Sequence, residues 1–139
     1  GIKTRTTEEI QKVIWGKVIY NCTLNPLASI LNVNYGRLLE SPYSKDIMRK
    51  VISEIYAVCE KKKIELESKT KEEYAKILFN KLIPLTASHK PSMLQDIEKR
   101  KKTEIDYLNG MIVQMGKEVN LHAETNQLLT ELIKCMEKQ

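Results

Sequence analysis

Apolar residues recur every three or four positions along most of the chain, which is the spacing of amphipathic α-helices. The clearest case is residues 44–62, where Val51, Ile55 and Val58 fall on one face. Glycine is sparse, and β-branched residues do not alternate with polar ones, so a sheet protein is disfavoured. We therefore predict an all-α fold, with one multi-helix domain over residues 1–139.

Capping residues and prolines set where the predicted helices begin and end. Thr6 or Thr7 caps a first helix that runs to about Asn25, and Pro26 either kinks this helix or opens a further segment to residue 31. Ser92 and Thr103 are expected to cap the helices that follow them. Further helical segments are predicted at residues 37–39, 44–62, 70–84 and 92–97, from residue 103 past residue 116, and at 124–136. On the last helix the large apolar residues are expected to face inward: Leu128, Leu129, Leu132 and Ile133.

Three polar residues of the first helix, Lys17, Asn21 and Asn25, are spaced four apart and form one line along it, here called the polar stripe. Apolar residues such as Ile14 and Val18 flank the stripe, which predicts that it lies in a largely buried surface. Buried polar groups lower stability unless they are satisfied, and asparagine is a poor helix former. The pattern therefore indicates a cleft or a ligand that uses these groups.

A structural interpretation of the same residues stays open. Asparagine side chains can bond to a helix backbone, and Pro26 leaves the carbonyl of Cys22 without its usual helical donor. Lys17 can extend from an apolar surface to water.

The charge pattern adds little to this picture. A net charge of +5 and a pI of about 9.0 could suggest nucleic acid, but acidic residues are interleaved with the lysines and no aromatic-rich strand is present. No apolar run reaches membrane length. We expect neither nucleic acid nor a membrane as a partner, and keep a basic nucleic-acid binder as the weakest alternative.

Cysteine and histidine content argues against disulfides and metals. Cys22, Cys59 and Cys135 are widely spaced, and His89 and His122 show no metal-ligand spacing. This pattern is typical of reduced cysteines in a cytoplasmic protein without a metal site. The chain begins at Gly1 rather than Met and leads directly into a predicted helix, which we interpret as part of something longer.

A second set of motifs lies far from the stripe: Ser92-Met-Leu-Gln-Asp96, Thr103-Glu-Ile-Asp106 and Asn109-Gly110. Taken singly, Ser92 is a plausible cap and Glu104 a first-turn acid. With Lys17, Asn21 and Asn25-Pro26, however, their order and spacing resemble the C-terminal domain of the ketopantoate reductase (2-dehydropantoate 2-reductase) family over nearly the whole chain.

The resemblance implies a specific enzyme context. Members of this family are two-domain oxidoreductases that reduce ketopantoate to pantoate with NADPH in pantothenate and coenzyme A biosynthesis. Their helical C-terminal domain, which is 6-phosphogluconate dehydrogenase C-terminal-like, often forms dimers and supplies the substrate side of an interdomain cleft. The five glycines here form no G-x-G-x-x-G, so we expect the NADPH-binding Rossmann domain to be absent from this chain and the isolated chain to be inactive.

Carried over position by position, the resemblance implies roles for five residues. Lys17 would be the general acid, Asn21, Asn25 and Ser92 would bind substrate, and Glu104 would help to bind substrate and arrange the site. An ammonium suits this chemistry because reduction of a 2-oxo acid builds negative charge on the carbonyl oxygen. In a semi-dry cleft Lys17 should lose its proton more easily, an effect that a nearby Glu104 would oppose.

Two departures from the family pattern concern the substrate. Where the family tends to show Gly-Ile-x-Thr-Pro-x-Asn, residues 120–126 keep only Asn126, and Pro91 stands where serine is common. Because relatives can reduce other 2-oxo acids, these departures leave the exact substrate open. The missing nucleotide domain motivates an alternative, a stand-alone helical dimerisation or binding module without catalytic activity.

Overall fold

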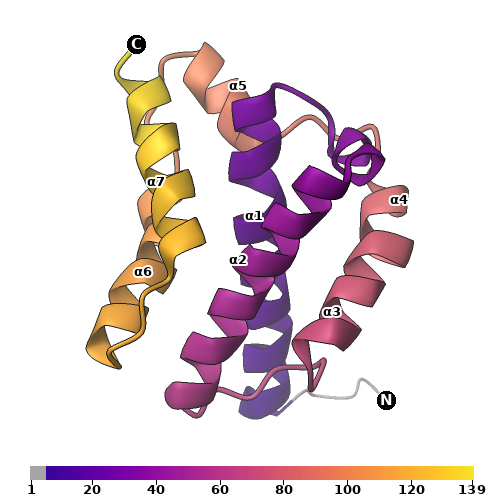
Figure 1. The fold of residues 1–139 in the computed structure, drawn as a ribbon, viewed down its shortest axis with the longest axis vertical. Coiled ribbons are helices and arrows are strands. Elements are labelled where there is room, and N and C mark those ends of the chain that lie inside the picture. The colour runs from indigo at the N-terminus through magenta and orange to yellow at the C-terminus, as the bar shows by residue number, and fades with distance from the viewer. Residues whose placement is uncertain (1–5) are drawn as a thin grey trace.

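The computed structural model describes residues 6–139, and these residues form α-helices and short helical turns with no strand (Figure 1). Gly1, where the chain begins, lies outside them. The predicted all-α fold is confirmed. The α-helices are α1 (Thr7–Leu31), α2 (Pro42–Lys61), α3 (Lys71–Ile77), α4 (Ile83–Leu85), α5 (Ser92–Glu98), α6 (Asn109–Glu118) and α7 (Glu124–Glu137). Two 3₁₀ turns, η1 (Tyr35–Glu40) and η3 (Ile105–Tyr107), and a π-helical stretch between α3 and α4, η2 (Leu78–Leu82), complete the described chain.

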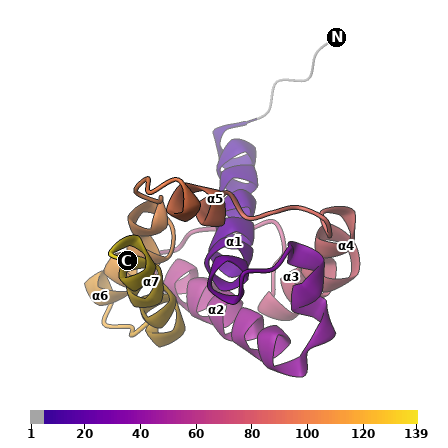
Figure 2. The ribbon, with the colours of Figure 1, turned by 90° about the horizontal axis from the view of Figure 1, so that it is seen from above.

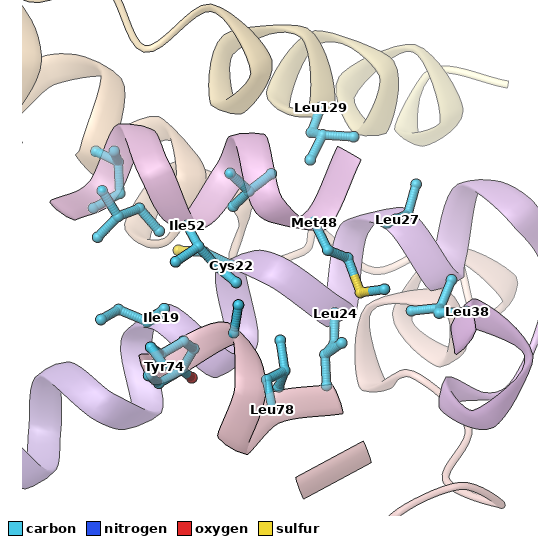
Figure 3. Packing of buried hydrophobic residues seen from close by; sticks show 14 of the residues in the cluster. Ile19, Cys22, Leu24, Leu27, Leu38, Met48, Ile52, Tyr74, Leu78 and Leu129 are labelled. Carbon is cyan, nitrogen blue, oxygen red and sulfur yellow. The ribbon is translucent and has the colours of Figure 1, made fainter. Parts of the chain in front are cut away.

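The long helix α1 organises the domain. It contacts α2, α5 and α7, while α3 and α4 lie on one side of the molecule and α6 and α7 on the other (Figures 1 and 2). The core fills the space between α1, α2, α3 and α7 with fully buried side chains such as Cys22, Leu24, Ile52 and Leu78 (Figure 3). This core fixes the face of α1 that carries the polar stripe.

The helix α1 continues without interruption past Pro26 to Leu31. Of the two predicted outcomes, a new segment at Pro26 is therefore wrong. The carbonyl of Cys22, which Pro26 deprives of its helical donor, accepts a 3.0 Å hydrogen bond from Nδ2 of Asn109. A donor from a distant helix thus satisfies the group that proline frees.

Two predicted caps are wrong. Ser92 is the first residue of α5, and the N–H of Met93 is instead capped by Oδ1 of Asn25, at 3.2 Å. The long helix predicted from residue 103 is absent, because Thr103 precedes only the short turn η3. Its hydroxyl accepts from the N–H of Ile105 at 3.3 Å and donates to the carboxylate of Glu137 at 2.6 Å. At the start of α5 a tertiary partner, Asn25, thus took over the role that local sequence suggested for Ser92.

Fewer apolar side chains of α7 are buried in the core than predicted. Leu129 and Ile133 are buried, but Leu128 and Leu132 are exposed. The start of α7 is held by Glu54 of α2, whose carboxylate accepts from the backbone N–H groups of Thr125 and Asn126 at 2.9 and 3.0 Å. This contact fixes the rotation of α7, so only part of its apolar surface reaches the core.

The first turns of α1 are more exposed than the sequence predicted. Ile10 is 46% and Ile14 is 52% exposed, and in Figure 2 this end of α1 projects beyond the other helices. The prediction of a buried surface is therefore wrong at Ile10 and Ile14, which stay exposed although the segment of residues 63–68 lies against another side of this half of the helix. No helix within residues 6–139 is both long and apolar enough to cross a membrane.

We expect one thiol per native chain to react with dithionitrobenzoate at neutral pH, and three to react after denaturation. Cys135 is exposed, whereas Cys22 and Cys59 are buried. Burial raises the pKa of both buried thiols, that of Cys59 to about 12, so the reactive thiolate is scarce. A second thiol that reacts as fast as Cys135 in the native protein would contradict this packing.

Candidate functional site

The polar stripe runs from solvent into the protein. The side chain of Lys17 is exposed, Asn21 is half-buried, and Asn25 is only 6% exposed. Within residues 6–139, the Lys17 side chain has no hydrogen bond or ion pair. The predicted semi-dry surroundings of Lys17 are therefore not provided by this domain alone, and its ammonium is available to a ligand.

The structure brings Asn25 and Ser92 together although 67 residues separate them. Nδ2 of Asn25 donates to Oγ of Ser92 at 3.3 Å, and Oδ1 accepts from the N–H of Met93. Because the Ser92 hydroxyl accepts from Asn25, its own hydrogen is left to donate to another group. Asn25 thus links α5 to α1 and positions the exposed Ser92 hydroxyl beside the polar stripe.

The segment before Ser92 is fixed by contacts that the sequence gave no signal for. The Tyr20 hydroxyl donates to Oγ1 of Thr86 at 2.9 Å, and the N–H of Gly36 donates to the carbonyl of Ala87 at 2.9 Å. These bonds hold the connection between α4 and α5 against α1 and η1. Ser92 is therefore placed by a well-anchored backbone.

Glu104 lies apart from the other four candidates in its contacts. Its side chain is exposed at the start of η3, and among the described residues it forms no ion pair with Lys17. Glu104, whose carboxylate would oppose proton loss from Lys17 if it lay nearby, thus does not pair with Lys17 in this domain. Four of the five candidates line α1 and the start of α5, and Glu104 follows α5.

Two buried carboxamide side chains, those of Asn109 and Asn126, meet α1 at Cys22 and are the main feature that sequence reasoning missed. Asn109 and Asn126 are both fully buried, and Nδ2 of Asn109 donates to the carbonyl of Cys22 and to Oδ1 of Asn126, each at 3.0 Å. The side-chain oxygen of Asn109, Oδ1, is buried and accepts no hydrogen bond from any described residue. The signal that could have found this pair was Pro26, because a proline inside a helix demands an outside donor for the carbonyl four residues earlier.

A mainly apolar hollow of about 330 Å³, here called the side pocket, opens next to Lys17. Gly16, Lys17 and Tyr20 of α1 form one wall, and Tyr74 and Ile77 of α3 form part of the other. Tyr74 and Ile19 lie together where α3 meets α1 (Figure 3). Larger hollows lie between α2 and α3 and beside the segment 64–72, but none of the five candidate residues lines them.

The site can bind an anion without a metal ligand set. An exposed ammonium, a free hydroxyl hydrogen and carboxamide N–H groups on one face suit a carboxylate or a developing oxyanion. In the part of the chain that the structure describes, no three His, Cys, Asp or Glu side chains gather closely enough to hold a metal ion.

The all-helical domain described above matches a known domain family. A family model described as Ketopantoate reductase PanE/ApbA C terminal matches residues 9–137. This chain therefore belongs to the ketopantoate reductase C-terminal domain family, as the resemblance in sequence predicted.

Curated relatives are longer than this chain. A 2-dehydropantoate 2-reductase of Aquifex aeolicus (strain VF5) is 46% identical over 137 residues, which are 99% of this chain and 44% of the relative. A 2-dehydropantoate 2-reductase of Pyrococcus abyssi (strain GE5 / Orsay) is 37% identical over 136 residues, covering 98% of this chain and 44% of the relative. The chain thus spans less than half the length of these relatives.

Solved structures share the fold. A PanE/ApbA family ketopantoate reductase from Ralstonia eutropha JMP134 matches with a TM-score of 0.81 at 29% identity, over 91% of this chain and 41% of that one. A D-mandelate dehydrogenase, solved with NADH and anilino(oxo)acetate, matches with a TM-score of 0.84 at 32% identity, over 96% of this chain and 43% of that one. The similar structures thus include a ketopantoate reductase and a D-mandelate dehydrogenase.

Proposed function

We propose that residues 1–139 are the substrate-side domain of an NADPH-dependent 2-dehydropantoate 2-reductase. The observation that carries this proposal is the 46% identity to a 2-dehydropantoate 2-reductase over 99% of the chain. In this proposal an N-terminal Rossmann domain holds the cofactor, because the chain contains no G-x-G-x-x-G to hold a dinucleotide. NADPH bound there supplies the hydride to the carbonyl carbon of ketopantoate.

The roles of this chain's residues follow from their chemistry. Lys17 donates a proton to the carbonyl oxygen as the hydride reaches the carbon, and its charge stabilises that oxygen before the proton moves. Asn21, Asn25 and Ser92 orient the substrate through its carboxylate and hydroxyl groups. Glu104, exposed at the start of η3, takes part in binding the substrate and arranging the site, as the resemblance implies. The exposure of Lys17 supports this division, since its face is left open for a second domain and a ligand.

The test is ketopantoate-dependent oxidation of NADPH by the full-length protein, compared with the isolated chain. We expect turnover in the full-length protein and none in residues 1–139 alone, because the isolated chain cannot collect hydride. Turnover by the isolated chain would contradict the assignment of the cofactor to a missing domain. The homodimer expected from the resemblance stays a prediction, which sedimentation of the full-length protein tests.

A second substrate class is favoured by one observation. The D-mandelate dehydrogenase solved with NADH matches this fold as well as the ketopantoate reductase does. We therefore include an aryl 2-oxo acid and NADH in the same assay. A higher kcat/KM for the aryl acid with NADH would assign the chain to that second activity.

A further inference from the structure

Gly16, the glycine of α1, is not required by close packing of its neighbours. A Cβ added at Gly16 would meet no heavy atom within 4 Å, whereas one at Gly36 or Gly116 would clash with neighbours at 2.9 and 2.7 Å. The backbone of Gly16 has no positive φ that would require glycine. Glycine in the middle of a helix lowers helix stability, so the fold itself gives no reason for this residue.

Gly16 is also one of the residues that line the side pocket. The phenols that border this pocket already donate to protein acceptors: Tyr20 to Thr86 at 2.9 Å, Tyr56 to the carbonyl of Ser68 at 2.8 Å, and Tyr74 to the carbonyl of Gly16 at 3.3 Å. What remains for a ligand is chiefly apolar surface. A ligand group that enters the pocket should therefore be apolar.

The side pocket and the polar stripe meet at Lys17. With about 100° between successive residues, Gly16 and Tyr20 lie on one side of Lys17 on the helix, and Asn21 and Asn25 lie on the other. A 2-oxo acid has its carboxylate on one side of the carbonyl and its substituent on the other. With the carbonyl oxygen at Lys17 and the carboxylate toward the asparagines, the substituent faces the side pocket.

The opposite orientation is disfavoured. Glu67 lines the side pocket, and its carboxylate would repel the carboxylate of a substrate placed there. Ser92 and Asn25, by contrast, offer hydrogen-bond donors and no negative charge.

We propose that the side pocket binds the apolar substituent of the 2-oxo acid and that Gly16 sets how large this substituent can be. This inference rests on the proposed function. The volume of about 330 Å³ is ample for a branched alkyl or a phenyl group, since an apolar cavity of about 150 Å³ holds benzene. Gly16 is then a specificity-determining residue, which holds space open beside the general acid.

The experiment measures kcat/KM of the full-length enzyme for pyruvate, ketopantoate and benzoylformate, which differ in the size of the substituent. In the Gly16→Leu variant we expect the ratio of benzoylformate to pyruvate to fall at least about tenfold, since a pocket can discriminate a single methylene by that factor. Gly16→Ala should shift the ratio in the same direction by less. Both substitutions favour the helix, so the fold should be kept.

Gln11→Leu is the matched control, because Gln11 is exposed on the same helix and does not line the side pocket. Its ratio should equal that of the wild type. If Gly16→Leu lowers kcat/KM by the same factor for all three acids, the pocket inference is overturned while the proposed function stands. If the wild type reduces none of them, the proposed function fails and the inference fails with it.

Discussion

Replacing Lys17 by alanine in the full-length enzyme is expected to lower kcat for ketopantoate reduction by at least about a hundredfold, the low end for loss of a general acid. The reason is that the Lys17 ammonium is exposed on the same line of α1 as Asn21 and Asn25 and, among residues 6–139, has no hydrogen-bond or ion-pair partner. In the proposed reaction its charge and proton are therefore available to the carbonyl oxygen of the substrate. Steady-state kinetics with saturating NADPH measure the effect, and near-normal turnover would reject Lys17 as the acid.

Two further variants separate proton transfer from charge. Lys17→Arg keeps the positive charge, but a guanidinium does not give up its proton in proteins, so kcat should stay at least about tenfold below wild type. Lys12→Ala is the matched control, because Lys12 lies on the same helix and pairs with the exposed Glu65 at 3.7 Å. Its kcat should be unchanged. A Lys17→Arg enzyme as fast as wild type would assign Lys17 a purely electrostatic role.

Local sequence predicted the helices well, because their signals lie within a few residues. Thr6, one of the two predicted caps, caps α1 through a reciprocal capping box with Glu9, and α2 spans Pro42–Lys61 where residues 44–62 were predicted. The error at Ser92 arose because a distant residue took over a local role. Asn25 caps α5 in place of Ser92, and no property of residues 88–95 indicates that partner.

The candidate site was predictable in composition but not in environment. The four-residue spacing placed Lys17, Asn21 and Asn25 on one line of α1, as the helix confirms. The exposure of each residue depends instead on what packs across that line, which is set by contacts far apart in the sequence. The apolar neighbours Ile10 and Ile14 suggested burial, yet both are exposed in this domain. Periodicity identifies a face and does not identify its partner.

The pairing of Asn109 with Cys22 has a large expected effect on stability. Asn109 is fully buried, and its Nδ2 is a donor both to the Cys22 carbonyl and to Oδ1 of Asn126. Asn109→Ala leaves two buried acceptors without this donor, and each such loss costs about 1–3 kcal/mol. We expect the free energy of unfolding to fall by about 3 kcal/mol, a large share of the about 5–15 kcal/mol that stabilises a typical domain. Urea unfolding followed by helical circular dichroism measures the change, and Gln114→Ala, at an exposed carboxamide of the same helix, should have little effect.

A double-mutant cycle with Pro26 tests the cause of this loss. Pro26→Ala restores a backbone N–H at position 26, which can donate to the Cys22 carbonyl four residues earlier in α1. In that background Asn109→Ala leaves only Oδ1 of Asn126 without a donor. The resulting fall in the free energy of unfolding should therefore be smaller by about 1 kcal/mol. Strictly additive losses would mean that Asn109 stabilises the domain mainly through Asn126. A smaller loss would establish that Asn109 compensates for the proline inside α1, and thereby keeps the helix that carries Lys17 and Asn25 continuous.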